Sequence, residues 1–118
     1  MFNVIIIKGD KLKDYNFFAK KCAYYLKEKG KSGEGITIFS TGDNFVEKFA
    51  TKYGITIQYF FPEWKKYGKN SLQIRDKNIL LNANALIAFD DGTSEIHHLI
   101  NEAKKLDIAI RVVKKESF

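Results

Sequence analysis

The fold follows from the stretch Val4-Ile5-Ile6-Ile7-Lys8-Gly9-Asp10-Lys11, near the start of the chain. Four consecutive β-branched residues are typical of a strand that is buried on both faces, as the strands of parallel sheets are. Polar residues and a glycine follow at once and predict a loop. Asp14 then has the position of an N-cap for a helix that extends to about Lys29, and Gly30 is expected to end that helix. A strand, a loop and a helix in this order form the first unit of an α/β fold.

The same unit recurs along the rest of the chain. Further strands are expected at residues 36–39, 55–61, 85–89 and 108–113, and further helices near Asn44–Tyr53, at Arg75–Asn82, and from Thr93 or Ser94 onward. Asn44 and Glu47 have the spacing of a capping box. Strands that alternate with helices imply right-handed crossovers. We therefore predict an α/β fold, a three-layer Rossmann-like sandwich with a mostly parallel sheet of about five strands and about four helices, in a single domain over residues 1–118.

Composition and hydropathy exclude several other classes of protein. The chain has 45% hydrophobic residues, which fits a globular domain rather than a disordered segment. No apolar run approaches the roughly 20 residues of a membrane span, and the segment after Met1 does not resemble a signal peptide. Cys22 is the only cysteine, and its place on the apolar stripe of the first helix predicts a core thiol rather than a nucleophile. We expect a cytoplasmic protein that does not contact membranes.

The formal net charge of +6 leaves two interpretations open. The chain has 20 basic and 14 acidic residues, and nearly all the basic ones are lysines scattered along the sequence. Only Arg75 and Arg111 carry the guanidinium group that suits bidentate recognition of phosphates or bases. The charge is therefore that of a solubilising surface, or that of a surface that attracts a phosphorylated ligand or nucleic acid.

Three loops carry residue types that suit a ligand. They are Gly9-Asp10-Lys11, Ser40-Thr41-Gly42-Asp43-Asn44 and Asp91-Gly92-Thr93-Ser94, and each follows an expected strand. In open parallel sheets, ligands bind beyond the carboxyl ends of the strands. Glycine allows close approach of the backbone, and hydroxyls and helix-start amides can hold phosphate or ribose oxygens. Each loop taken alone also fits an ordinary turn or helix cap, so the case for a site depends on all three lying on one rim.

Motifs for common catalytic classes are missing. The chain contains neither a Gly-x-x-x-x-Gly-Lys-Ser/Thr phosphate loop nor a Gly-x-Gly-x-x-Gly fingerprint, which argues against ordinary NTPases and dinucleotide-dependent dehydrogenases. His97 and His98 are adjacent on a helix and therefore diverge by about 100°, so they are not expected to chelate a metal. Three carboxylates are candidates for an acid or base, although caps and surface charges are the commoner role: Glu63, Asp90 and Asp91.

An aromatic and basic stretch, Phe61-Pro62-Glu63-Trp64-Lys65-Lys66-Tyr67-Gly68-Lys69, lies between the two halves of the expected sheet. Trp64 and Tyr67 offer flat faces that can cover a pocket or stack on a base. Lys69 and Arg75 supply cations nearby. The alternative is that the two rings only anchor a long connection onto the core.

Several of these segments together resemble a known family. The stretch Phe61–Lys69 is followed by Ile74-Arg75-Asp76 and then by Ala85-Leu86-Ile87-Ala88-Phe89-Asp90-Asp91-Gly92-Thr93-Ser94. In this order the segments are similar to the YspA-like, DUF2493 branch of the SLOG superfamily, which also includes the LOG and DprA/Smf proteins. The family's second loop corresponds to Ser40–Glu47, and its Gly-Thr-x-His segment corresponds to Glu95–His98. The Pro-Gly-Gly-x-Gly-Thr-x-x-Glu motif of LOG phosphoribohydrolases is absent.

The resemblance implies that the strand ends bind a nucleotide or a nucleotide-derived small molecule. The absent hydrolase motif favours a non-catalytic sensor or a protein that sequesters a nucleotide signal, and the diverged loops suggest a phage or another mobile element as its source. Two alternatives stay open: an N-glycosidic hydrolase of LOG type with Glu47 or Asp91 as its acid, and a DprA-like nucleic-acid-binding module. No cofactor or metal is expected, and assembly into a homo-oligomer stays open. The expected ligand-binding residues are Gly9, Lys11, Ser40, Gly42, Trp64, Tyr67, Lys69, Arg75, Asp91, Gly92, Thr93 and Ser94.

Overall fold

Residues 1–31 and 35–114 are described in the computed structural model of the protein. The connection expected at Lys31–Gly35 and the tail expected at Lys114–Phe118 fall outside these residues at positions 32–34 and 115–118. The elements, in chain order, are β1 (Phe2–Lys8), α1 (Tyr15–Lys31), β2 (Ile36–Ser40), α2 (Asn44–Tyr53), β3 (Thr56–Tyr59), α3 (Trp64–Tyr67), the 3₁₀ helix η1 (Gly68–Asn70), α4 (Ser71–Leu81), β4 (Ala85–Phe89), α5 (Ser94–Lys104) and β5 (Ala109–Val113).

The strands of the described residues form one sheet in the order β3-β2-β1-β4-β5. All four neighbouring pairs are parallel, and β1 lies in the middle, with Val4 opposite both Ile38 of β2 and Ala85 of β4. The chain winds outward from β1 to β3 in its first half and from β4 to β5 in its second half. The order of the strands therefore reverses between β1 and β4, and this is the point at which open α/β sheets bind ligands.

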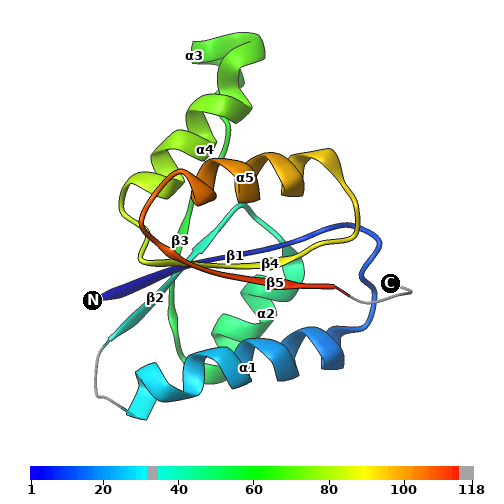
Figure 1. Ribbon diagram of the computed structural model, residues 1–118, viewed down its shortest axis with the longest axis vertical. Coiled ribbons are helices and arrows are strands. Elements are labelled where there is room, and N and C mark those ends of the chain that lie inside the picture. The colour runs from blue at the N-terminus through cyan, green and yellow to red at the C-terminus, as the bar shows by residue number, and fades with distance from the viewer. Residues whose placement is uncertain (32–34, 115–118) are drawn as a thin grey trace.

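Helices cover both faces of the sheet, as Figure 1 shows, with α1 and α2 on one side and α4 and α5 on the other. Both faces need a cover because the residues of the central strand β1 point alternately into two apolar cores, one on each side of the sheet. Val4 and Ile6 pack with the first core, on the side of α1 and α2, whereas Ile5 and Ile7 pack with the second core, on the side of α4 and α5. Full burial of each such side chain stabilises the fold by roughly 1.5–3 kcal/mol. The predicted three-layer α/β architecture is confirmed.

Cys22 belongs to the first core and has no exposed surface, and burial raises the pKa of its thiol. The prediction of a core thiol is therefore confirmed. No helix among the described residues is both long enough and apolar enough to cross a membrane.

Several predicted boundaries were wrong for local physical reasons. The first helix does not end at Gly30 but continues through it to Lys31. The helix expected from Arg75 begins four residues earlier, at Ser71, and is preceded by two short helical turns, α3 and η1. The hydroxyl of Ser71 joins these turns to α4, because its single proton is shared between the carbonyl oxygens of Gly68 and Glu63. The third strand ends at Tyr59 rather than at Phe61, since its only partner, β2, ends opposite it at Ser40.

The helix α2 has a different cap and a narrower buried face from those expected. Asp43, not Asn44, is its N-cap, and the Asp43 carboxylate accepts hydrogen bonds from the amides of Phe45 and Val46. Tyr53, expected to point inward, has 52% of its surface exposed because it occupies the last turn of the helix. Gly54 ends α2 with a φ of 63°, as the sequence predicted.

Candidate functional site

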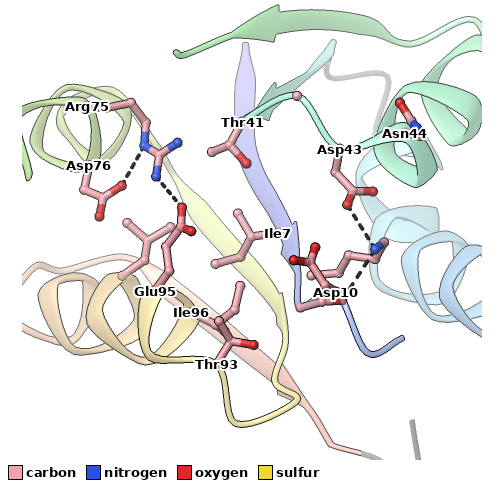
Figure 2. Close-up of a pocket in the computed structure, with 14 residues that line it drawn as sticks. Ile7, Asp10, Thr41, Asp43, Asn44, Arg75, Asp76, Thr93, Glu95 and Ile96 are labelled. Atoms are coloured by element: carbon pink, nitrogen blue, oxygen red, sulfur yellow. Dashed lines mark hydrogen bonds and ion pairs between the residues drawn. The ribbon is translucent and has the colours of Figure 1, made fainter. Parts of the chain in front are cut away.

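A cavity of about 360 Å³ lies at the carboxyl end of the sheet, where the strand order reverses. Its wall is built from the end of β1, the loop between β2 and α2, the side of α4 and the first turn of α5. Figure 2 shows Arg75 and Asp76 on one side, Asp43 and Asp10 on the other, and Ile7 between them. A volume of this size is at the lower end of the range for small-molecule sites.

Arg75 is the main cationic residue on the α4 side of the cavity, and two carboxylates already hold its guanidinium group. Its Nε donates to Asp76 at 2.8 Å and its Nη2 donates to Glu95, in the first turn of α5, at 2.7 Å. The side chain of Arg75 is 5% exposed and that of Glu95 is 52% exposed, so the pair spans from the interior to the surface. The remaining terminal nitrogen of Arg75 points toward Thr41 across the cavity in Figure 2. That nitrogen is the donor that a ligand can reach.

Asp76 lies behind Arg75 and is 3% exposed. Burial raises the pKa of its carboxyl group, and the attraction of Arg75 and of His98 offsets only part of this effect. The net direction is a raised pKa, so the ion pair with Arg75 does not fully compensate the loss of hydration. Asp76 therefore holds Arg75 in position, although the Asp76 carboxylate loses hydration when it is buried.

On the opposite side of the cavity, Lys8 ties the end of β1 to the loop before α2. Its ammonium group lies 3.1 Å from Oδ2 of Asp43 and 4.6 Å from the centre of the Phe45 ring. Asp43 uses its other carboxylate oxygen to cap α2, with Oδ1 accepting from the amide of Phe45 at 2.8 Å. The charge of Lys8 is thus shared with a carboxylate and an aromatic ring before any ligand arrives.

Asp91 connects two of the loops around the cavity. Its Oδ2 accepts from the amide of Lys11 at 2.9 Å, and its Oδ1 accepts from the amide and the hydroxyl of Thr93. A Cβ atom at Gly9 would lie 1.9 Å from Cγ of Asp91, so only glycine allows this contact. Partial burial raises the pKa of Asp91, but the hydrogen bonds from Thr93 and Lys11 outweigh burial, and the net pKa is below its ordinary value. Asp91 is therefore an ionised structural link.

The first turn of α5 faces the cavity without a side-chain cap. Thr93 is the N-cap by position, but its hydroxyl donates to Asp91 instead of accepting from the helix. The expectation that Thr93 or Ser94 caps the helix is confirmed for Thr93 in position but not in hydrogen bonding. Amides at the start of a helix carry partial positive charge and can receive an oxygen of a ligand.

The cavity as a whole is acidic. Among the described residues that line it, four carry carboxylates and two carry cations, which leaves a formal charge of −2. The carboxylates are Asp10, Asp43, Asp76 and Glu95, and the cations are Lys8 and Arg75. The net charge of +6 of the chain is therefore located elsewhere on the surface.

The structure brings four of the predicted ligand-binding residues to the cavity wall: Gly9, Gly42, Arg75 and Thr93. Five others lie nearby without lining it: Lys11, Asp91 and Gly92 in the loops, Ser40 at the end of β2 and Ser94 at the start of α5. Ser40 is fully buried, and its hydroxyl accepts from the amide of Gly42 at 3.0 Å. Trp64, Tyr67 and Lys69 belong to α3 and η1 and do not line the cavity. Glu47 is exposed on α2, and the pKa of Tyr59 is raised first by partial burial and then by the charge and hydrogen bond of Glu47.

Several lining residues were missed from the sequence. Lys8, Thr41 and Asp43 lie in or beside loops that the sequence predicts, but no local pattern indicates which residues of these loops line the cavity. Asp76 directly follows Arg75, so its proximity was readable. The contact between Arg75 and Glu95 joins residues 20 positions apart on two different helices, and no local pattern signals it.

Comparisons with known proteins add no family assignment, because no family model, no curated protein and no solved structure matches the chain. Within the described part of the chain, no three His, Cys, Asp or Glu residues are grouped so that they could hold a metal ion.

Proposed function

We propose that the protein binds a nucleotide-derived small molecule in the cavity at the carboxyl end of the sheet. The observation that carries the proposal is the cavity's place at the reversal of strand order, between β1 and β4, with the start of α5 facing into it. Parallel α/β sheets bind nucleotides at this position. The resemblance to the SLOG superfamily supports the same ligand class.

The charges of the cavity favour the nucleoside part of such a molecule over a chain of phosphates. Two like charges 4 Å apart repel by about 1 kcal/mol in water and by about 4 kcal/mol at the effective dielectric constant of a protein surface. Each phosphate would meet four carboxylates and only two cations, both already paired. Ribose hydroxyls and base amino groups are donors, and carboxylates accept from them. One phosphate can be received by the free nitrogen of Arg75 or by the start of α5.

Binding without catalysis, as in a sensor or a sequestering protein, fits this arrangement better than hydrolysis does. The two acids considered for an N-glycosidic hydrolase, Glu47 and Asp91, do not line the cavity. Asp91 is also engaged by three donors and has a lowered pKa, which suits neither an acid nor a free base. If hydrolysis occurred, free base would be released when nucleosides or nucleotides are incubated with the protein; recovery of intact ligand supports binding alone.

A titration of matched ligands tests the proposal. Adenosine, guanosine, cytidine and uridine are compared with their 5′-mono- and triphosphates by thermal shift and calorimetry. We expect at least one nucleoside or monophosphate to bind, and its triphosphate to bind more weakly. Replacement of exposed Asp10 by Asn removes one cavity carboxylate and should strengthen triphosphate binding, whereas Asp107→Asn, at a position outside the cavity lining, should not. Tighter binding of triphosphates by the unmodified protein, or no binding by any member, would contradict the proposal.

A further inference from the structure

The segment Tyr59–Asn70, here called the arm, extends from the rim of the cavity, where Phe61 lies against Gly42, and carries a different surface. In Figure 1, α3 lies at the tip of the molecule, beyond α4 and away from the sheet. Three of the five aromatic side chains of the arm are strongly exposed: 59% of Phe61, 54% of Trp64 and 39% of Tyr59. Soluble proteins seldom expose several large apolar rings close together unless a partner covers them. Phe61 and Trp64 are three residues apart, so their backbones lie within about 11 Å of each other.

Hydrogen bonds build the arm into a defined shape. The carbonyl oxygen of Glu63 accepts from the amides of Lys66 and Tyr67 and from the hydroxyl of Ser71. The chain turns at Gly68, whose φ of 55° favours glycine. Ser71 is fully buried and fixes the base of the arm. The exposed rings are therefore presented by an ordered segment, which reduces the entropy lost when they bind a partner.

Two of the rings already show the geometry of stacking. Tyr59 and Phe61 have ring centres 5.5 Å apart and planes inclined by only 10°. The ring of Phe61 also lies against Gly42, where a Cβ atom would approach Cε1 of Phe61 to 2.8 Å. This contact seats one side of the aromatic pair on the loop before α2. Both rings stay partly exposed, and the side chain of Tyr59 also has a hydrogen bond with Glu47 of α2.

The arm is basic where the cavity is acidic. Lys65, Lys66 and Lys69 are exposed, and Glu63 is the only carboxylate within the arm. Lys66 lies 5.2 Å from the centre of the Tyr67 ring, and the pKa of its ammonium group is raised, first by a hydrogen bond to Tyr67 and then by the charges of Tyr67 and Glu63. Within residues 64–69, the three lysines therefore lie beside the aromatic rings of Trp64 and Tyr67.

From this combination of exposed rings and exposed lysines in one ordered segment, we infer that the arm binds single-stranded nucleic acid. Flat exposed rings stack on bases of any sequence, and lysines beside them neutralise the phosphates between the bases. In a duplex the faces of the bases are covered by their neighbours, so the rings of the arm would have nothing to stack on. The inference does not depend on the small-molecule proposal, because Trp64 and the three lysines do not line the cavity.

Trp64 is the only tryptophan of the chain and is half exposed, so its fluorescence reports directly on the arm. We expect titration with oligo(dT) to quench this fluorescence. If the three lysines each neutralise one phosphate, the logarithm of the binding constant should fall with the logarithm of salt concentration with a slope of about −2. Unchanged fluorescence, or equal binding to a duplex of the same length, would overturn the inference.

Substitutions in the arm test whether oligonucleotides bind there. With a labelled oligo(dT) and anisotropy as the readout, Trp64→Ala should weaken binding by about tenfold or more, as the loss of one base–aromatic stack does. The triple change of Lys65, Lys66 and Lys69 to Gln should abolish most of the salt dependence. Matched controls are Tyr24→Ala, a similarly exposed aromatic residue on α1, and Lys104→Gln with Lys105→Gln at the end of α5.

If the arm binds another kind of partner, the measurements will differ. A second copy of the chain on this surface would appear as a Trp64-dependent dimer in analytical ultracentrifugation and would overturn the inference. An acidic protein partner is indicated if poly-glutamate competes with oligo(dT) at equal charge, and that result would also overturn it. Asp10→Asn should leave oligonucleotide binding unchanged, and Trp64→Ala should leave nucleoside binding unchanged, so the two proposals fail separately.

Discussion

Arg75 connects the stability of the protein to its candidate site. The guanidinium group is held by a buried carboxylate, Asp76, and by a half-exposed one, Glu95. The sequence indicated Arg75 as a contact for phosphate, and the residue does line the cavity. Its pairing with Glu95 was not readable, since it depends on how α4 and α5 pack. The sequence therefore identified Arg75 but not the pair of carboxylates that neutralises its charge.

Removal of Arg75 should destabilise the protein because Asp76 would be left buried and unpaired. We expect Arg75→Gln to lower the free energy of unfolding by about 3 kcal/mol and to raise the pKa of Asp76 further. Urea denaturation measures the first effect. Arg111→Gln, at an exposed position on β5, is the matched control and should change stability by less than about 0.5 kcal/mol. If Arg75→Gln proved as stable as the unmodified protein, Asp76 would not depend on Arg75 for its charge.

Asp91 should contribute stability that depends on pH. Its pKa is lowered in the folded protein, so the ionised carboxylate favours folding above the unfolded-state pKa of about 3.9. This contribution is lost as the pH falls through the lower, folded-state pKa. We expect Asp91→Asn to cost about 1 kcal/mol at pH 7, with the difference from the unmodified protein shrinking below about pH 4. Thermal denaturation across this range tests the expectation, and a difference that grew in acid would contradict it.

The strands at the centre of the sheet were predictable from their own residues. The bounds of the elements at its edge depend on the elements that they contact. The central strand β1 and its neighbour β4 are continuous apolar runs, and both were predicted because each is buried on both faces. The edge strand β3 is mostly exposed, and its end is set by the end of β2 rather than by its own residues. The short helices α3 and η1 contain no buried residue, so no apolar period reveals them.

The cap of α2 offers a direct test at this scale. Asp43 caps the helix and also pairs with Lys8, whereas Asn44 only begins the helix. We expect Asp43→Ala to lower the free energy of unfolding by about 1–2 kcal/mol, since it removes both interactions. Asn44→Ala should have little effect on the cap. Chemical denaturation of the two variants compares them directly, and a larger loss for Asn44→Ala would favour the capping box that the sequence suggested.

At the scale of the whole molecule, the fold separates two surfaces of opposite charge. The reversal of strand order places an acidic cavity among loops that the sequence had identified by their position after the strands. The aromatic and basic stretch, expected to form a wall of that cavity, contacts its rim only through Phe61 at Gly42, whereas its helix α3 lies at the tip of the molecule. Its placement depends on where α4 begins and how α4 packs, and neither follows from the stretch itself. The net charge of +6 describes the outside of the protein and not the cavity.

The most direct test of the central proposal is a map of amide chemical shifts in ¹⁵N–¹H correlation spectra. Adenosine, guanosine, cytidine and uridine and their 5′-monophosphates are added in turn at millimolar concentration. We expect at least one of them to move the amides of three segments together: the end of β1 at Gly9, the loop Thr41–Asn44 and the first turn of α5 from Thr93. Shifts confined to the arm or to the sheet edge at β5, or no shifts with any ligand, would contradict a nucleotide site in the cavity.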